Sequence, residues 1–357
     1  MLRAKEFCER FGLKRPILLA PMAGACPASL SIAVANDGGM GAAGVLMMTS
    51  SQIDAWVKEF RQSSDGKFQL NNWIPAAPVK RNPEEEAKVR TFLESWGPPV
   101  PAEAGNTTLP NFKEQCEAML RAKPAAISSI MGLYSADFVQ LMKKEGISWF
   151  ATVTTVEEAK LAEAAGADVI LAQGFEAGGH RGSFHPGDAE SRAVGLISLV
   201  PSIVDAVRIP VVAAGGIADP RQIAAALLLG ASAVQIGTGF LRTPEAKTPQ
   251  VYTDAIGKTA PENTRVTRAF SGRAGRSIAT DFVRAASAPD APSPAPYPVQ
   301  RGLTAPMKAL GQKIGDIHRM QAWAGQSAAL AEAAPAGEVL TRLWDATRKI
   351  LQDGSKL

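Results

Sequence analysis

The stretch Pro210-Val-Val-Ala-Ala-Gly-Gly-Ile217 and the later stretch Ala233-Val-Gln-Ile-Gly-Thr-Gly239 decide the fold of this chain. Both are short apolar runs that end in glycine. Between them, Asp219 before Pro220 is a typical helix start, and Gly230 is a typical helix end. Near-continuous apolar strands are expected in a parallel sheet, because helices cover one face and a packed core fills the other. The two stretches therefore predict a strand–helix–strand unit.

The same alternation extends through most of the first two-thirds of the chain. We expect strands at residues 17–22, 40–45, 68–73, 125–130, 148–153, 169–173, 210–215 and 233–237. We expect helices at residues 28–37, 52–61, 136–145, 156–165, 196–207 and 220–229. Eight strands favour an α/β fold of the closed (β/α)8 TIM type, typically about 250 residues long. An open doubly wound sheet is the competing architecture, but six strands would suit it better than eight.

Two regions break this alternation. Residues 74–124 hold two predicted helices and are too long for a barrel connection, and the strand–helix rhythm stops after about Phe240. The Pro- and Ala-rich residues 288–298 then lead to helical segments near 306–323 and 337–351. We therefore expect residues 1–73 and 125–245 to form the barrel. We expect residues 74–124 and 246–357 to form a second, mostly helical domain over its mouth.

The composition excludes several classes of protein. The 357 residues are 20% charged and 46% hydrophobic, which is ordinary for a soluble globular chain. The net charge of +4 is spread along the sequence, so no basic cluster indicates nucleic-acid binding. No apolar run approaches the ~20 residues of a membrane span, and the first residues lack a signal-peptide core. The cysteines Cys8, Cys26 and Cys116 fit neither a disulfide framework nor a metal site. We expect a cytoplasmic protein, either a monomer or a homodimer.

Glycines follow the last two predicted strands, where such barrels form their active sites. Gly215 and Gly216 end the seventh strand, and Gly237-Thr238-Gly239 ends the eighth. Their N–H groups, at the starts of short helices, are suited to bind a phosphate. The alternative is that these glycines only make tight turns. Glycine groups at two consecutive strand ends favour the phosphate site.

His180 is the main candidate for acid–base chemistry. It lies in the loop after the sixth strand, directly behind Gly178 and Gly179. A histidine titrates near neutrality, so it can take a carbon-bound proton or hold an anion. The competing interpretation is a structural loop residue. His185 fits an exposed loop and His318 a helix of the C-terminal region.

The common catalytic motifs are missing from the sequence. It has no Gly-x-Ser-x-Gly elbow, no P-loop and no His-Glu-x-x-His motif. The chemistry is therefore expected to come from a cofactor. Asn71 and Gln173 at strand ends, together with Met22, suit the amide-rich edge of a flavin better than a metal.

Several of these stretches together resemble the nitronate monooxygenase family, formerly called 2-nitropropane dioxygenases, and within it class I. The similar stretches are Ala20-Pro-Met22, residues 173–182, 213–217 and 235–238, the run Thr267-Arg-Ala-Phe-Ser-Gly-Arg273, and the region from Pro296 to Pro306. The resemblance spans nearly the whole chain. It implies an FMN-binding barrel covered by a helical substrate-binding domain.

The resemblance also implies roles for individual residues. His180 matches the catalytic histidine of the family. The implied cofactor contacts are Pro21 and Met22 against the flavin, Asn71 and Gln173 at its polar edge, Gly178 and Gly179 close to it, and Gly215, Gly216, Gln235, Ile236, Gly237 and Thr238 at the phosphate. Ile130 occupies the place of a second histidine at the end of the fourth strand, which makes the site more apolar. Ile130 and Tyr297 are the expected substrate contacts.

The implied reaction is the oxidation of alkyl nitronates, and of nitroalkanes as a further class, by O2 to a carbonyl compound and nitrite. Ile130 leaves room for a substrate larger or less polar than the usual small anion. The alternative is an FMN-dependent NAD(P)H:quinone or enoyl-thioester reductase, because one barrel hosts many chemistries. A flavin-binding protein without enzymatic activity is the third interpretation.

Overall fold

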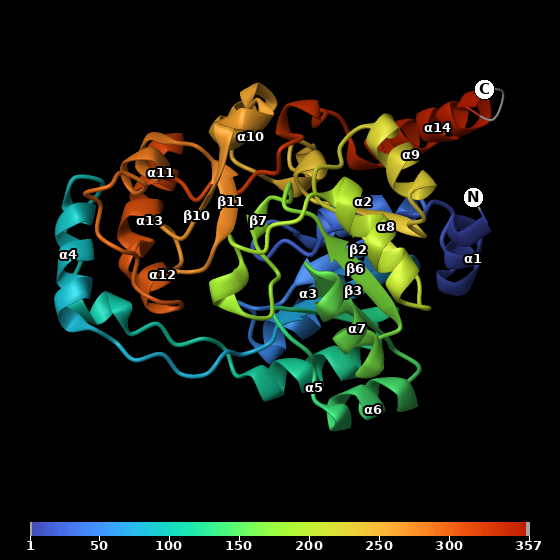
Figure 1. Ribbon diagram of the computed structural model, residues 1–357, viewed down its shortest axis with the longest axis horizontal. Helices are drawn as coiled ribbons and strands as arrows, with labels where there is room; N and C mark the ends of the chain where they lie inside the picture. Colours follow the sequence, from blue (N-terminus) through green and yellow to red (C-terminus); the bar gives the residue numbers. More distant parts are fainter. Residues whose placement is uncertain (1, 355–357) are drawn as a thin grey trace.

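The computed structural model describes residues 2–354 and contains the predicted closed parallel barrel (Figure 1). Neighbouring strands pair in sequence order, and the last pairs with the first through Leu18 and Gln235. The predicted (β/α)8 fold is thus confirmed, and no predicted barrel strand is missing. The barrel strands are β1 Ile17–Leu19, β2 Met40–Gly44, β3 Lys67–Trp73, β4 Ala126–Ile130, β5 Ser148–Val153, β6 Val169–Gln173, β8 Val211–Ala214 and β9 Ala233–Ile236.

Helices cover the outside of the barrel, and α3 and α9 begin at side chains that cap them. Thr49 and Gln52 form a capping box at the start of α3. The Asp219 side chain accepts from the N–H of Arg221 at the start of α9, and Pro220 is the first helical residue. The helices are α2 Ala28–Asn36, α3 Ser50–Ser63, α5 Phe112–Ala122, α6 Ala136–Lys144, α7 Val156–Ala164, α8 Leu196–Ala206 and α9 Pro220–Leu228.

The barrel interior is apolar at one end and polar at the other. Helix α1, Leu2–Phe11, packs its Phe7 and Phe11 rings against Phe150 of β5 and so closes the apolar end. The amino-terminal ends of the strands meet there. The carboxyl ends of the strands open at the other side, where the site was expected.

The layer over the mouth contains a sheet that the sequence did not indicate. Strand β7, Gly179–His180, pairs antiparallel with β11, Gly275–Ile278, which pairs with β10, Thr264–Thr267. These strands are too short for an alternating pattern to be recognised. Around the sheet lie α4 Pro83–Glu94, α10 Gln250–Lys258, α11 Asp281–Ala285, α12 Val299–Leu303 and α13 Ala305–Ile314, of which α4, α11, α12 and α13 gather at one end of the molecule (Figure 1).

Two helices expected in this second domain pack on barrel helices. Helix α5 lies against α3, and α14, Ala336–Gly354, lies against α2 and α9. The helix expected at residues 306–323 ends at Ile314, because Gly315 adopts a left-handed conformation with φ 68°. The division of the chain into two domains stays a prediction.

Candidate active site

Polar side chains form the inner layer at the open end of the barrel. Gln69 Nε2 donates to Gln235 Oε1 over 2.9 Å, and Asn71 Nδ2 donates to Ser128 Oγ over 3.0 Å. All four side chains are buried. The Oε1 atom of Gln69 is buried without a hydrogen-bond partner. Such an oxygen is costly to leave unpaired, so the layer is suited to a ligand that donates hydrogen bonds.

The backbone around His180 is fixed by Gln173 at the end of β6. Gln173 Nε2 donates to the carbonyl oxygen of His180 over 3.0 Å, and Gln173 Oε1 accepts from Gly182 N over 2.8 Å. Arg181 Nη1 also donates to Gln173 Oε1. The Gln173 amide was expected at the edge of the flavin. In the structure its oxygen is already used to hold the loop that carries His180.

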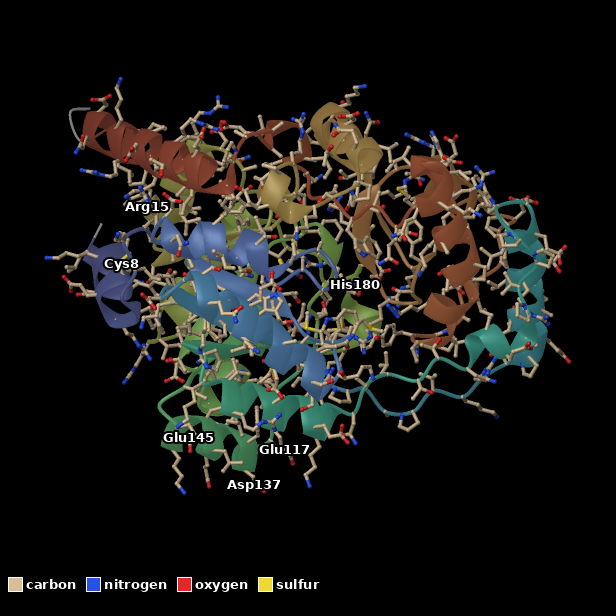
Figure 2. The ribbon with its side chains drawn as sticks, turned by 180° about the vertical axis from the view of Figure 1, so that it is seen from behind. Cys8, Arg15, Glu117, Asp137, Glu145 and His180 are labelled. Atoms are coloured by element: carbon tan, nitrogen blue, oxygen red, sulfur yellow. The ribbon has the colours of Figure 1, made fainter. Side chains whose placement is uncertain are left out.

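The His180 ring lies between the barrel and the layer above it (Figure 2). Its Nε2 atom is 2.8 Å from Ser271 Oγ. The rings of Trp73, from β3, and Trp323 approach it at centroid distances of 4.7 and 4.8 Å, both in edge geometry. Burial, and then the charges of nearby cationic side chains, lower the pKa of His180 to about 3. The imidazole is therefore neutral near pH 7.

Arg273, Arg301 and Lys308 supply the positive charge that acts on His180. Within residues 2–354, none of the three forms an ion pair with a carboxylate. Burial, and then Arg301, lower the pKa of Lys308 to about 7. Arg273 is buried, and Arg301 and Lys308 are half-buried. Cations that are withdrawn from water without a carboxylate partner are costly. Their clustering therefore favours an anionic ligand beside His180.

Tyr297, predicted to contact substrate, lies at the edge of this cationic cluster. Its ring centroid is 5.3 Å from that of Trp73, and the Arg273 guanidinium lies 5.8 Å from the Tyr297 ring. The Tyr297 hydroxyl is buried without a hydrogen-bond partner. The second predicted contact is Ile130. A Cβ added at Gly182, two residues after His180, would lie 3.2 Å from Ile130 Cγ1. Both therefore lie close to the His180 loop and its neighbours.

The loops after β8 and β9 come together at the predicted phosphate site. Gly215 and Gly216 adopt φ values of 106° and 66°, which only glycine takes up readily. In the part of the chain that the structure describes, no protein oxygen accepts from the backbone N–H of Gly216 or Thr238. These donors are free for an anion.

The remaining predicted cofactor contacts lie around these loops, and one of them, Ile236, faces the site only with its backbone. A Cβ on Gly178 would be 3.0 Å from Thr238 Oγ1, whereas a Cβ on Gly179 would meet nothing within 4 Å. Met22 Sδ would lie 3.3 Å from a Cβ on Gly237. Ile236 points its side chain into the core between barrel and helices, so only its backbone faces the site. Pro21 is half-buried and lies two residues after β1.

Several residues of the site were not expected from the sequence. They are Ser271, Arg273, Lys308 and Trp323, whereas Trp73 stands at the end of the third predicted strand, among the strand ends where the site was expected. Arg273 lies in a stretch that carries the family resemblance, but nothing local to it indicates contact with the His180 region. Lys308 and Trp323 follow the barrel by many residues. Only the packing of the upper layer brings them to the mouth.

The described part of the chain contains neither a candidate metal site nor a helix that could span a membrane. No group of three or more His, Cys, Asp or Glu side chains in residues 2–354 could hold a metal ion. No helix among the same residues is long and apolar enough to span a bilayer. Burial raises the pKa of the Cys26 thiol to about 12, so this cysteine is not an activated nucleophile.

Comparison with known proteins gives a consistent result over nearly the whole chain. The profile of the nitronate monooxygenase family matches residues 5–345. A nitronate monooxygenase of Paraburkholderia phytofirmans is 38% identical over 338 residues, which cover 93% of this chain and 92% of that protein. A probable nitronate monooxygenase of Staphylococcus aureus is 33% identical over 355 residues and covers 99% of both chains.

Solved structures show the same similarity. The nitroalkane oxidase from Streptomyces ansochromogenes has a TM-score of 0.83 at 34% identity and covers 95% of this chain and 98% of its own. FabK from Thermotoga maritima has a TM-score of 0.74 at 26% identity and covers 98% of each chain. The match of the family profile and the identity to the curated relatives lead to one conclusion: this chain belongs to the nitronate monooxygenase family of oxidoreductases.

Proposed function

We propose that this enzyme binds FMN and oxidises alkyl nitronates, and nitroalkanes as a second substrate class, with O2 to a carbonyl compound and nitrite. The observation that carries the proposal is the cluster of Arg273, Arg301 and Lys308 beside the neutral His180. A nitronate is an anion, so it would compensate these charges. A neutral nitroalkane would not. The cluster therefore supports a preference for the preformed nitronate.

The residues at the mouth fit FMN. The unpaired oxygen of Gln69 suits a ring N–H, and the open space over Gly179 leaves room for a flat group. The free N–H groups of Gly216 and Thr238 suit a single phosphate. No second nucleotide-binding motif was found in the sequence, which favours FMN over FAD. Bound FMN would supply the redox chemistry, accepting electrons from the substrate and passing them to O2.

His180 would act differently on the two substrate classes. A nitroalkane must first lose a carbon-bound proton. The neutral imidazole of His180 has a lone pair to accept it, but its low pKa makes it a weak base for this step. A nitronate has already lost this proton and needs only to be held. Binding of an anion beside His180 would also raise the low pKa of the imidazole, because opposite charge favours its protonated form. The site therefore suits nitronate oxidation with little acid–base work.

The proposal is tested by the colour and the reduction of the purified protein. We expect a yellow protein that releases FMN on heating, and bleaching of the flavin when a nitronate is added without oxygen. Addition of NADPH under the same conditions should leave the spectrum unchanged. Release of FAD, or a colourless protein that takes up no FMN, would refute the cofactor assignment.

A reductase that uses NAD(P)H is the second candidate. The same barrel occurs in the enoyl reductase domain of MlnA, at 12% identity and a TM-score of 0.67, so the fold alone does not separate the two activities. The unpaired cations could also attract the phosphates of a nicotinamide cofactor. Anaerobic bleaching by NADPH and not by nitronate would favour this candidate.

A further inference from the structure

Residues 322–327, which we call the mouth strap, run from the antiparallel sheet to the loops after β8 and β9. We call these two loops the phosphate loops. At the sheet, Ile278 N donates to the carbonyl oxygen of Ala322 over 2.9 Å, and Ala324 N donates to that of Arg276 over 3.3 Å. The strap is therefore paired along β11. It comes from the C-terminal part of the chain, far in sequence from the glycine loops.

The other end of the mouth strap bonds to both phosphate loops. Ser327 Oγ donates to the carbonyl oxygen of Gly216 over 2.7 Å, in the loop after β8. Gly325 N donates to Thr238 Oγ1 over 3.0 Å, in the loop after β9. One short segment thus ties together the two loops whose N–H groups are free.

These bonds orient the groups that would face a phosphate. Because Thr238 Oγ1 accepts from Gly325, its own hydrogen is free to be donated away from the strap. Ser327 Oγ also accepts from Gln222 Nε2 over 2.7 Å, and Gln222 Oε1 accepts from Ala218 N over 2.8 Å. This chain of bonds fixes the loop after β8, including the left-handed backbone at Gly216.

The mouth strap also reaches His180. Trp323 lies within the mouth strap, and the centroid of its ring is 4.8 Å from the centroid of the His180 ring. The packing in between is close, since a Cβ on Gly178 would lie 2.5 Å from Gly325 N. Gly178 is two residues before His180. A movement of the mouth strap would therefore displace both the phosphate loops and the loop that carries His180.

We propose that the mouth strap preorganises the phosphate site and links its occupation to the placement of Trp323 beside His180. Gly325 and Ser327 are positioning residues that act through Thr238 and Gly216. The inference rests on the proposed binding of FMN. It adds a third segment, supplied by the C-terminal part of the chain, to the two glycine loops.

The test compares FMN with riboflavin, which lacks the phosphate. In Ser327→Ala we expect the Kd of FMN to rise about tenfold and the Kd of riboflavin to change less than twofold, because the lost bonds order only the phosphate loops. Ser327→Thr, which keeps the hydroxyl, should restore FMN binding. Ser202→Ala is the matched control, because the hydroxyl of this exposed serine bonds only within helix α8.

Hydrogen exchange provides a second measurement that does not depend on activity. FMN should slow exchange at the amides of Gly325 and Gln326 in the wild type more than riboflavin does, and this difference should be lost in Ser327→Ala. Both ligands are added at saturating concentrations, so that the difference in protection reports the phosphate and not the fraction of protein bound. Equal rises of both Kd values, or equal protection by both ligands, would overturn the role of the strap. Failure of the wild type to bind FMN at all would instead refute the proposed function.

Discussion

His180 Nε2 lies 2.8 Å from Ser271 Oγ, so the loop after β6 and the segment between β10 and β11 share one hydrogen bond. Ser271 is 1% exposed, and its hydroxyl also lies 3.3 Å from the carbonyl oxygen of Arg273. A hydroxyl that donates to this carbonyl would accept from Nε2 of the imidazole. The serine therefore fixes the orientation of the ring and selects its tautomer.

Ser271→Ala should disturb the histidine without emptying the cofactor site. We expect the rate of nitronate oxidation to fall about three- to tenfold, as loss of one hydrogen bond predicts. The ¹⁵N resonances of the His180 ring should shift toward a mixture of tautomers, and FMN content should not change. Ser31→Ala is the control, because Ser31 is equally buried but bonds to Ala42 in the barrel wall. Unchanged resonances would remove Ser271 from this role.

His180→Asn should separate the two substrate classes. General acid–base catalysis is typically worth ~10²–10⁴-fold, so oxidation of a neutral nitroalkane should almost disappear. Oxidation of a preformed nitronate should remain measurable with weaker binding, and its loss should be at least about tenfold smaller. Steady-state oxygen consumption with both substrates gives the comparison. Equal losses would show that His180 is not the base.

Lys308 should make nitronate binding depend on pH. Its pKa of about 7 means that it loses its charge as the pH rises through neutrality. We expect the KM for a preformed nitronate to rise roughly fivefold to tenfold between pH 6 and 8.5. In Lys308→Arg, which stays charged, the KM should be flat over this range. Lys313→Met, on the exposed side of the same helix, should behave as the wild type; a flat wild-type profile would contradict the prediction.

The low pKa of His180 should also affect stability. In the unfolded chain a histidine binds a proton near pH 6.5, whereas folded His180 binds one only near pH 3. The unfolded state therefore binds more protons between these values, and folding stability falls as the pH drops below 6.5. When the pH is lowered from 7.5 to 5, the free energy of unfolding measured in urea should fall by about 1–2 kcal/mol more in the wild type than in His180→Asn. Identical losses of stability would show that the pKa of His180 is not lowered by burial in the folded protein.

Gly215→Val tests the phosphate loops. A Cβ at Gly215 would lie 2.9 Å from Ala177 Cβ at a φ of 106°, so the loop after β8 must shift. We expect a protein with wild-type circular dichroism but little bound FMN. Gly187→Val is the matched control, because a Cβ there meets nothing within 4 Å and the φ is ordinary. Stoichiometric FMN in Gly215→Val would disprove the phosphate assignment.

The barrel was predictable because each strand carries its own signal. Buried parallel strands such as β5 and β6 are apolar on both faces, and a run of that kind bounded by helix caps is recognisable without any knowledge of partners. The (β/α)8 order then places the carboxyl ends of the strands together. For that reason Asn71, Gln173 and the glycines of β8 and β9 could be assigned to one mouth in advance.

The sheet over the mouth was not predictable in this way. Strand β7 has two residues, Gly179 and His180, and exists only because β11 lies beside it. Its pairing is a contact between segments far apart in the chain, and no periodicity within the loop after β6 announces it. The sequence therefore identified His180 as a candidate and not the surface that holds it.

The sequence by itself determined the barrel, the glycine loops and the likeness of the site to one family, because these depend on short local patterns. Only the tertiary structure decided that Ser271 and Trp323 contact His180 and that the charge of Lys308 acts on it. Ser271 is 91 residues beyond the histidine and lies between β10 and β11. Burial and the charge of neighbouring side chains, which set the pKa values of His180 and Lys308, arise only when these segments pack.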